Sequence, residues 1–471
     1  MQAMLVFPNQ LFVHNRADTV FFFLEDAHFF DMGIPFHKHK IMLHVASMKA
    51  HFDQLSGEKH YLKYPFTLDT LKKALQGFNE VIAYDPVDHR IKSHYESLNI
   101  TWLETPNFLT SDYIITEFFK NRSRYFMHDF YIFQRKRLNI LMDHDAPING
   151  RYSFDTENRK TLPKDLSVPK PLEFSKNSYV IEAAKWTNMM FKDNPGTTDT
   201  FNHPTTRQEA LRQLDSFLEE KFSNFGPYQD ALSDQDPFLF HSNLSSSLNI
   251  GLLNPNEIIS KALEKDVPIE SKEGFIRQII GWREFMRAIY LLEGIQMKSS
   301  NVLNHQHKLS KTWYNATTQL PIVDQVIRKL IDHAYSHHIE RLMVLGNIMM
   351  LSNIHPKDVY TYFMAMHIDA YDWVMVPNIY GMSQFASGNL MTTKPYFSGA
   401  NYLKKMGVKN GPWSETWDAL FYLFLKDHRA LIEKNPRLSI LIKNLDKKDL
   451  KTMNHYTALK NDFLSITVLP N

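Results

Sequence analysis

The first 120 residues alternate short apolar runs with segments in which apolar positions recur with helical spacing. The apolar runs cover 3–7, 20–24, 80–84 and 99–103, and the helical segments cover 38–55, 68–78, 88–98 and 112–119. Strands that alternate with helices at this spacing predict a parallel, doubly wound sheet. The first third of the chain is therefore expected to be an α/β domain.

Helical spacing dominates the chain from about Tyr179 onward, with Pro and Gly turn signals between the segments. The stretch 143–176 differs, because it is polar, rich in proline and only weakly periodic, as interdomain linkers are. We expect an α/β domain over 1–142, a linker over 143–178 and a large all-α domain over 179–471. Several classes of enzyme share this architecture, so it does not name a function.

Composition narrows the chemistry. The 471 residues include no cysteine, which excludes disulfides, thiol nucleophiles and thiolate metal sites. The net charge of +2 argues against a strongly cationic coat, although 394–451 carries twelve Lys or Arg against six Asp or Glu. The opening MQAMLVFPNQLF lacks a basic region and predicts a strand, and no apolar run is long enough to span a bilayer. We expect a cytoplasmic protein with no membrane partner.

Four motifs carry most of the candidate chemistry. FHSNLSSSLNIG begins at Phe240, where hydroxyls ahead of a predicted helix start indicate an anion site or simple capping. EGFIRQIIGWREFMRAIY begins at Glu273 and HAYSHHIERLMVLGN at His333. The segment from Asp369 to Lys405 is polar, rich in glycine and weakly periodic, as a cavity lining is.

Two histidine-rich segments could be taken for metal sites, but their patterns do not favour metal binding. His337 and His338 are adjacent on a predicted helix, so their side chains point about 100° apart and form a poor pair of ligands. The segment HKHK at 37–40 is expected to be a solvated helix face. No metal site is predicted.

The four motifs together resemble the photolyase/cryptochrome family, and especially its bacterial (6-4) photolyase branch. The resemblance implies a helical domain that binds FAD, UV-damaged DNA as the partner, and a monomer. Members of that branch usually hold an iron–sulfur cluster with four cysteines. Here Ile322 stands at the first cysteine position and the segment 407–417 replaces the others, so no iron–sulfur cluster is expected.

The resemblance also implies roles for individual residues. His338 would donate a proton to the lesion, beside His337, Gln278 and Tyr396, and the amide of Gln278 can both donate to and accept from a modified base. Tyr314, Tyr362 and Trp373 would carry electrons, and Lys394, Tyr396, Tyr402, Lys404 and Lys405 would contact DNA. The FAD-binding residues would be His241, Ser242, Leu244, Ser245, Asn249, Gln278, Arg283, Arg341, Asp369, Asn378 and Met382.

Some expectations stay open at this point. Met48 and its segment resemble a domain that binds a 6,7-dimethyl-8-ribityllumazine antenna, but Asn9 stands where an acid is expected and an acid near Phe29 or Phe30 is missing. A light-driven (6-4) photolyase is the function that the motifs favour. A cryptochrome-like photoreceptor without repair activity and a flavin-free nucleic-acid-binding helper are the alternatives.

Overall fold

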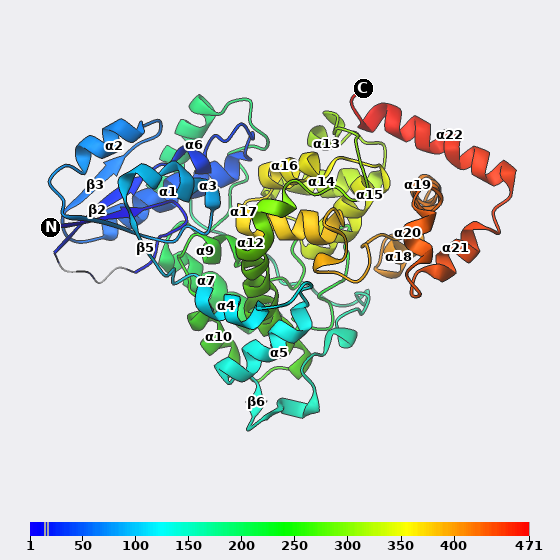
Figure 1. Cartoon of the computed structure of the whole chain (residues 1–471), viewed down its shortest axis with the longest axis horizontal. Helices are drawn as coiled ribbons and strands as arrows, with labels where there is room; N and C mark the ends of the chain where they lie inside the picture. Colours follow the sequence, from blue (N-terminus) through cyan, green and yellow to red (C-terminus); the bar gives the residue numbers. More distant parts are fainter. Residues whose placement is uncertain (14–15, 17, 471) are drawn as a thin grey trace.

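A five-stranded parallel sheet forms the N-terminal part of the computed structural model, which describes residues 1–13, 16 and 18–470 (Figure 1). The strand order is β3-β2-β1-β4-β5, so the chain moves outward from β1 first to one edge and then to the other. Met4 pairs with Phe21 on one side and with Ile82 on the other. The strands are β1 (Gln2–Val6), β2 (Thr19–Leu24), β3 (Lys59–Leu62), β4 (Glu80–Tyr84) and β5 (Thr101–Leu103).

The doubly wound α/β prediction is confirmed, with one strand missed. The edge strand β3 reads KHYL and is at least partly exposed along its whole length, so it has no apolar run to mark it. The helices of this part are α1 (Lys38–Gln54), α2 (Leu68–Ala74) and α3 (His89–His94).

The expectation that residues 37–40 form a solvated face is wrong. His37, His39 and Lys40 are buried, because α1 packs between the sheet and the helical part of the chain. The Lys40 ammonium donates to the carbonyl of Ala370, at 2.5 Å, and lies 4.2 Å from the Phe36 ring. Burial lowers the pKa of Lys40 to about 7. A carbonyl and an aromatic ring can stabilise the charge of a buried lysine. Such a lysine can therefore lie in an interface even where the sequence pattern predicts an exposed helix face.

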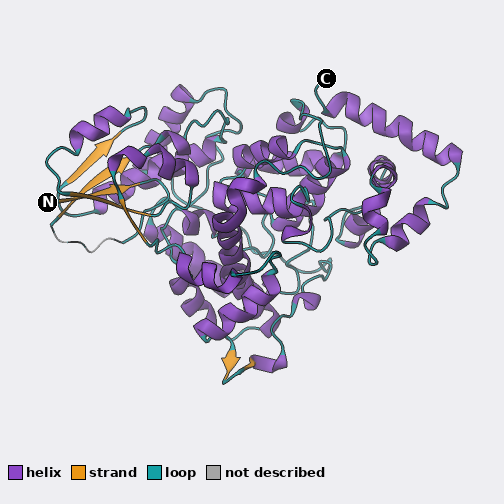
Figure 2. Cartoon of the chain, in the orientation of Figure 1, coloured by secondary structure: helices purple, strands orange, loops and turns teal. Residues whose placement is uncertain are grey.

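Helices are the main regular elements of the remaining chain, and loops connect them (Figure 2). A short hairpin of β6 (Met142–Asp143) and β7 (Ala146–Pro147) opens the linker. No helix among the described residues is long and apolar enough to cross a membrane. The helices are α4 (Asp112–Phe119), α5 (Met127–Leu138), α6 (Ser178–Met190), α7 (Arg207–Ser216), α8 (Phe222–Phe225), α9 (Ser245–Asn249), α10 (Pro255–Glu264), α11 (Ile269–Ile276), α12 (Glu284–Met297), α13 (Thr312–Asn315), α14 (Pro321–His333), α15 (Asn347–Leu351), α16 (Pro356–Met366), α17 (Asp372–Val376), α18 (Ala400–Lys405), α19 (Trp413–Asp427), α20 (Arg429–Glu433), α21 (Ser439–Leu445) and α22 (Leu450–Thr467).

Three helices widen into π-helical turns at segments that the motifs singled out. These turns are η6 (Arg277–Arg283), η7 (Glu340–Gly346) and η8 (Pro377–Ser383). A π turn adds a residue to the helix and redirects the side chains near it, and such turns occur frequently at functional sites. Each of the three contains a glycine, and Gly346 of η7 lies against Ser383 of η8.

Gly346→Ala should destabilise the protein by about 1–3 kcal/mol, because a Cβ there would lie 2.3 Å from the Ser383 hydroxyl and 2.8 Å from the Arg341 carbonyl. Urea denaturation would measure the loss. In a Ser383→Ala background the same change should cost less, since the nearest atom is gone. A Gly346→Ala variant as stable as the parent would show that η7 and η8 are not tightly packed.

Several histidines are buried in the region where α1 meets the helical part. Burial lowers the pKa of His37 and His203 to about 4 and the pKa of His44 to about 3. In the unfolded chain these side chains have a pKa of about 6.5. Below that pH the unfolded state binds more protons than the folded state, so acid favours unfolding.

The free energy of unfolding should therefore be nearly constant above about pH 7 and fall between about pH 6.5 and pH 4. Urea titrations at stepped pH would measure this slope, and His44→Asn should make it shallower by removing one of the groups. A stability that does not change down to pH 5 would contradict the burial of these imidazoles in neutral form.

Candidate functional site

The carboxylate of Asp369 joins three of the motifs. It accepts a hydrogen bond of 2.7 Å from the Ser245 hydroxyl and pairs with the Arg341 guanidinium at 3.0 Å. The side chain of Asn249 donates to the Asp369 backbone carbonyl at 3.1 Å. Burial alone would raise the pKa of Asp369, but Arg341 and Ser245 outweigh it and leave the pKa lowered. Asp369 is thus a buried anion that holds the α9 segment and η7 together.

Arg283 links the remaining motif, which begins at Glu273, to the group of residues around Asp369. Its guanidinium lies 3.4 Å from the Asn249 amide oxygen and donates to the Asn107 carbonyl. It also faces the rings of Phe108 and Trp373, at 4.2 and 5.1 Å from their centroids. Burial lowers the pKa of Arg283 to about 9. The four motifs, which are spread over residues 240–405, therefore converge on one place.

The start of α9 differs from the expected helix N-terminus. The helix is five residues long, its N-cap is Leu244, and no side chain caps it. Ser245 is instead committed to Asp369. Simple capping is therefore wrong for this motif.

A cavity of about 240 Å³ opens beside the α9 segment. His241, Ser242 and Ser245 line it, together with Lys170 and Leu172 from the linker. Two buried polar atoms of this loop, His241 Nε2 and Asn243 Oδ1, have no partner among the described residues. A buried polar atom without a hydrogen-bond partner costs free energy unless a ligand binds to it. The cavity therefore suits a ligand with polar groups, such as the phosphates and ribose of a dinucleotide.

His241, His337 and His338 form a cluster whose nitrogens lie within 4.8 Å of one another. The rings of His241 and His337 are stacked, with centroids 4.9 Å apart and an angle of 14° between their planes. A metal ligand uses the lone pair in its ring plane, so two stacked rings do not aim at one ion. Burial lowers the pKa of both His241 and His337 well below the usual range, so these two are neutral. We assign no metal here, and the absence of one stays a prediction.

His338 differs from its neighbour because its side chain is 45% exposed and bonded to an acid. Its Nε2 lies 2.9 Å from Oδ1 of Asp230, a residue to which sequence reasoning gave no role. Gln278 lies on η6 and donates to the Gly274 carbonyl at 3.0 Å. The phenol of Tyr396 is close enough to Asp155 and Arg159 of the linker for their charges to act on its pKa, which burial raises.

The tyrosines predicted to carry electrons are neighbours. The rings of Tyr314 and Tyr362 are 5.2 Å apart. Burial raises the pKa of Tyr314 to about 12 and that of Tyr362 further, and the Tyr362 hydroxyl has no partner among the described residues. A phenol without a proton acceptor is hard to oxidise. The relay through this pair stays a prediction.

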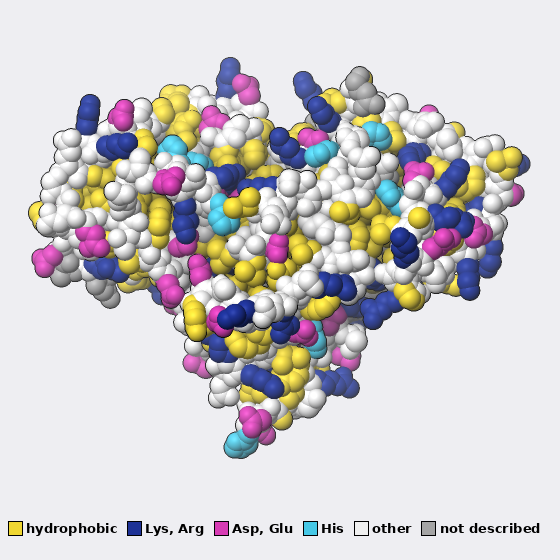
Figure 3. Space-filling model, in the orientation of Figure 1, with side chains coloured by type: hydrophobic (Ala, Val, Ile, Leu, Met, Phe, Trp, Pro, Cys, Tyr) yellow, Lys and Arg dark blue, Asp and Glu magenta, His cyan; other side chains and the backbone are white. Residues whose placement is uncertain are grey.

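The other predicted residues have varied surroundings. Asn378 and Met382 lie on η8, with the Asn378 amide donating to Val374 at 2.8 Å. Lys394 and Lys405 are exposed and Lys404 is partly exposed. Figure 3 shows Lys and Arg side chains, mixed with some Asp and Glu, over the end of the molecule where α20–α22 lie. These DNA contacts stay predictions.

Two departures from the (6-4) branch can also be located. Trp413 and Trp417 are buried with their rings 6.0 Å apart, so the rewritten segment supplies core. Met48 is fully buried, and the Asn9 amide donates to the Pro86 carbonyl at 3.2 Å. Lumazine binding stays a prediction.

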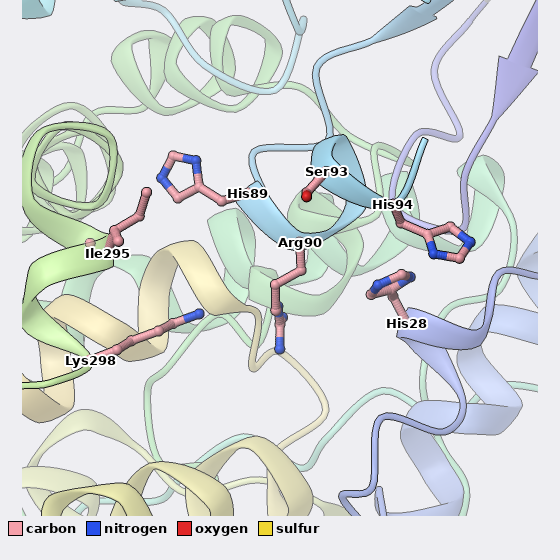
Figure 4. A pocket seen from close by; sticks show the side chains of 8 residues that line it. His28, His89, Arg90, Ser93, His94, Ile295 and Lys298 are labelled. Atoms are coloured by element: carbon pink, nitrogen blue, oxygen red, sulfur yellow. The ribbon is translucent and has the colours of Figure 1, made fainter. Parts of the chain in front are cut away.

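A second cavity, of about 520 Å³, lies between α3 and the end of α12 (Figure 4). Arg90 reaches into it from α3, and the rings of His28 and His94 lie 5.2 Å apart at one side. Its cations are neutralised, because Arg90 pairs with Asp88 at 2.6 Å and Lys298 with Asp372 at 2.5 Å. None of the predicted site residues lines this cavity.

Comparisons with known proteins place the chain in a family. The family of deoxyribodipyrimidine photo-lyase-related proteins matches residues 4–203, and the FAD-binding domain of DNA photolyase matches residues 275–410. The chain is also 32% identical to a (6-4) photolyase of Agrobacterium fabrum over 435 residues, which is 86% of each protein. The chain belongs to the photolyase family.

Other relatives are more distant or shorter. An uncharacterised protein of Acanthamoeba polyphaga mimivirus is 47% identical over 85 residues, covering 18% of this chain and 69% of that protein. A bacterial class III photolyase from Agrobacterium tumefaciens superposes with a TM-score of 0.58 at 16% identity, over 98% of this chain and 96% of that one. An archaeal photolyase from Sulfolobus tokodaii, solved with two FAD molecules, gives 0.51 at 13% identity, over 98% and 100%. These two structures show a shared fold.

Proposed function

We propose that this protein uses FAD and light to repair DNA and that its substrate is the (6-4) pyrimidine photoproduct. The observation that carries the proposal is the convergence of the four motifs on the buried Asp369–Arg341 pair. Beside this pair lies a cavity whose loop has two buried polar atoms without a partner in the described part of the chain. The identity to a (6-4) photolyase over most of the chain supports the type of lesion.

The residues present fit FAD. The loop at His241–Ser245 would meet the phosphates and ribose with its hydroxyls and its orphaned atoms, while Arg341 and Asn378 would lie along the ring system. When bound and reduced, the cofactor supplies an electron to the lesion under blue light and recovers it afterwards. Arg341 offers a positive charge to an anionic ring, and Asp369 prevents that charge from standing alone in the interior.

The chain's own part in the reaction is to hold the lesion and move a proton. The exposed imidazole of His338 can reach a base that has left the DNA double helix. The neighbouring His337 is buried and neutral, and it forms part of the wall of the site. Gln278 and Tyr396 offer polar edges from the neighbouring segments. Salt should weaken DNA binding in proportion to the phosphates contacted by lysines such as Lys394 and Lys405.

The purified protein should contain one FAD per chain and no iron, since the flavin motifs converge and no cysteine is present. Release of the flavin by denaturation, with chromatography and elemental analysis, would measure both. Stoichiometric iron, or FMN in place of FAD, would contradict the proposal.

His338→Ala should lower the yield of light-driven repair by about 10²–10⁴-fold, the usual contribution of general acid catalysis, with FAD still bound and photoreducible. The measurement is the repair yield on an oligonucleotide with one (6-4) photoproduct at equal flavin occupancy.

His455→Ala is the matched control, because His455 is 52% exposed and also bonded to an acid, Glu415, at 3.0 Å. It lies on α22, away from the site, so repair should be unchanged. His333 is a less suitable control, since it lines the cavity beside His241. Full repair by His338→Ala would mean that the proton has another source.

A further inference from the structure

The interdomain linker reaches the candidate catalytic histidine through Asp230. We propose that Asp230 positions His338 for proton transfer and that Arg159 and Asn158 of the linker hold Asp230 in place. This inference rests on the proposed function, because it names the groups that prepare the proton donor of that reaction. It gives a role to two segments, the linker and the loop after α8, that sequence reasoning left without chemistry.

The contact between Asp230 and His338 determines which imidazole nitrogen can face the lesion. Asp230 Oδ1 lies 2.9 Å from Nε2, so the proton of the neutral ring resides on Nε2. Nδ1 then has no partner among the described residues, and it is the nitrogen that a bound lesion can meet. To act as the donor, the ring first takes a second proton from solvent at Nδ1. The Nδ1–H bond then breaks as this proton passes to the lesion, and the Nε2–H bond to Asp230 is kept. A carboxylate that fixes the tautomer and orientation of a catalytic imidazole is well established in enzymes.

The linker fixes Asp230 by both backbone and side chain. The Asp230 amide donates to the Asn158 carbonyl at 3.2 Å, and the Asn158 amide donates to the Gln229 side chain at 2.9 Å. Gly274 lies beneath this pair, and a Cβ there would be 3.1 Å from the Asn158 amide nitrogen. The loop therefore has a preferred position against α11.

Charges of alternating sign run from the protein interior to His338 along this path. Glu273, which is fully buried, pairs with Arg277 at 3.0 Å, and Arg277 reaches Asp155 of the linker at 3.1 Å. Asp155 pairs with Arg159 at 2.5 Å, and Arg159 lies 3.8 Å from the second oxygen of Asp230. Isolated exposed ion pairs contribute little to stability. The role of this row of charges is therefore to orient Asp230. It leaves one oxygen of Asp230 for His338.

The test compares Asp230→Asn, Asp230→Glu, Arg159→Ala and Arg159→Lys with two controls, Asp234→Asn and Lys160→Ala. Asp234 is an exposed acid four residues away that pairs with Lys409, and Lys160 is an exposed linker cation next to Arg159. Repair would be measured under single-turnover blue light on a (6-4) oligonucleotide, with lesion affinity measured in the dark. Imidazole ¹⁵N spectra of the FAD-loaded protein would report the tautomer of His338, assigned by its absence in His338→Ala.

We expect Asp230→Asn to lower the repair yield about tenfold or more while lesion affinity changes less than about threefold, and Arg159→Ala to have a smaller effect in the same direction. Asp230→Glu and Arg159→Lys should recover part of the yield, and both controls should match the parent. The parent spectrum should show the neutral ring protonated at Nε2. A further variant for the spectra alone, Asp230→Ala, should lose that preference.

Two results would overturn the proposal. One is an Asp230→Asn variant that repairs as the parent does, and the other is a parent His338 with no preference for the Nε2 tautomer. A parent that repairs no lesion would instead refute the proposed function, and the spectra would still decide whether Asp230 orients His338.

Discussion

The buried carboxylate of Asp369 is the interaction on which the candidate site depends. An isolated carboxylate in this position would be unstable, and it is held by a guanidinium, a hydroxyl and the hydrogen bond that Asn249 makes to its backbone. These partners come from segments that are far apart in the sequence. Removing Asp369 would leave Arg341 unpaired and would release the α9 segment from η7, so this pair holds the α9 segment, which lines the cavity, in place.

The π turns explain how three helices can present polar groups here while staying packed. The widened turn η6 carries Gln278 and Arg283, η7 carries Arg341, and η8 carries Asn378 and Met382. Gly346 allows η7 to approach η8 closely, because a Cβ there would collide with Ser383. The site is therefore built on helices whose regular hydrogen bonding is interrupted where function needs side chains. This local irregularity is supported by extensive packing around it.

Sequence patterns predicted the parts of the fold that depend on periodicity. The sheet and its helices follow from apolar runs and helical spacing, and α4 matches its expected range. Patterns failed where tertiary contacts decide. The polar edge strand β3 has no apolar run, and Lys40 is buried because a carbonyl from the helical part meets its charge. Resemblance to a family selected His338 and Arg341, but Asp230 became interpretable only when the fold placed it 2.9 Å from His338.

The central claim is light-driven reversal of one lesion, and it can be measured directly. The reduced, FAD-loaded protein would be mixed with two matched duplexes, one with a single (6-4) photoproduct and one with a single cyclobutane dimer, and each kept in the dark or under blue light. Chromatography of the digested DNA would follow each lesion. Our account predicts loss of the (6-4) photoproduct in the light alone, with the cyclobutane dimer unchanged. Preferential repair of the cyclobutane dimer, or no repair in the light by protein with bound and reduced FAD, would contradict it.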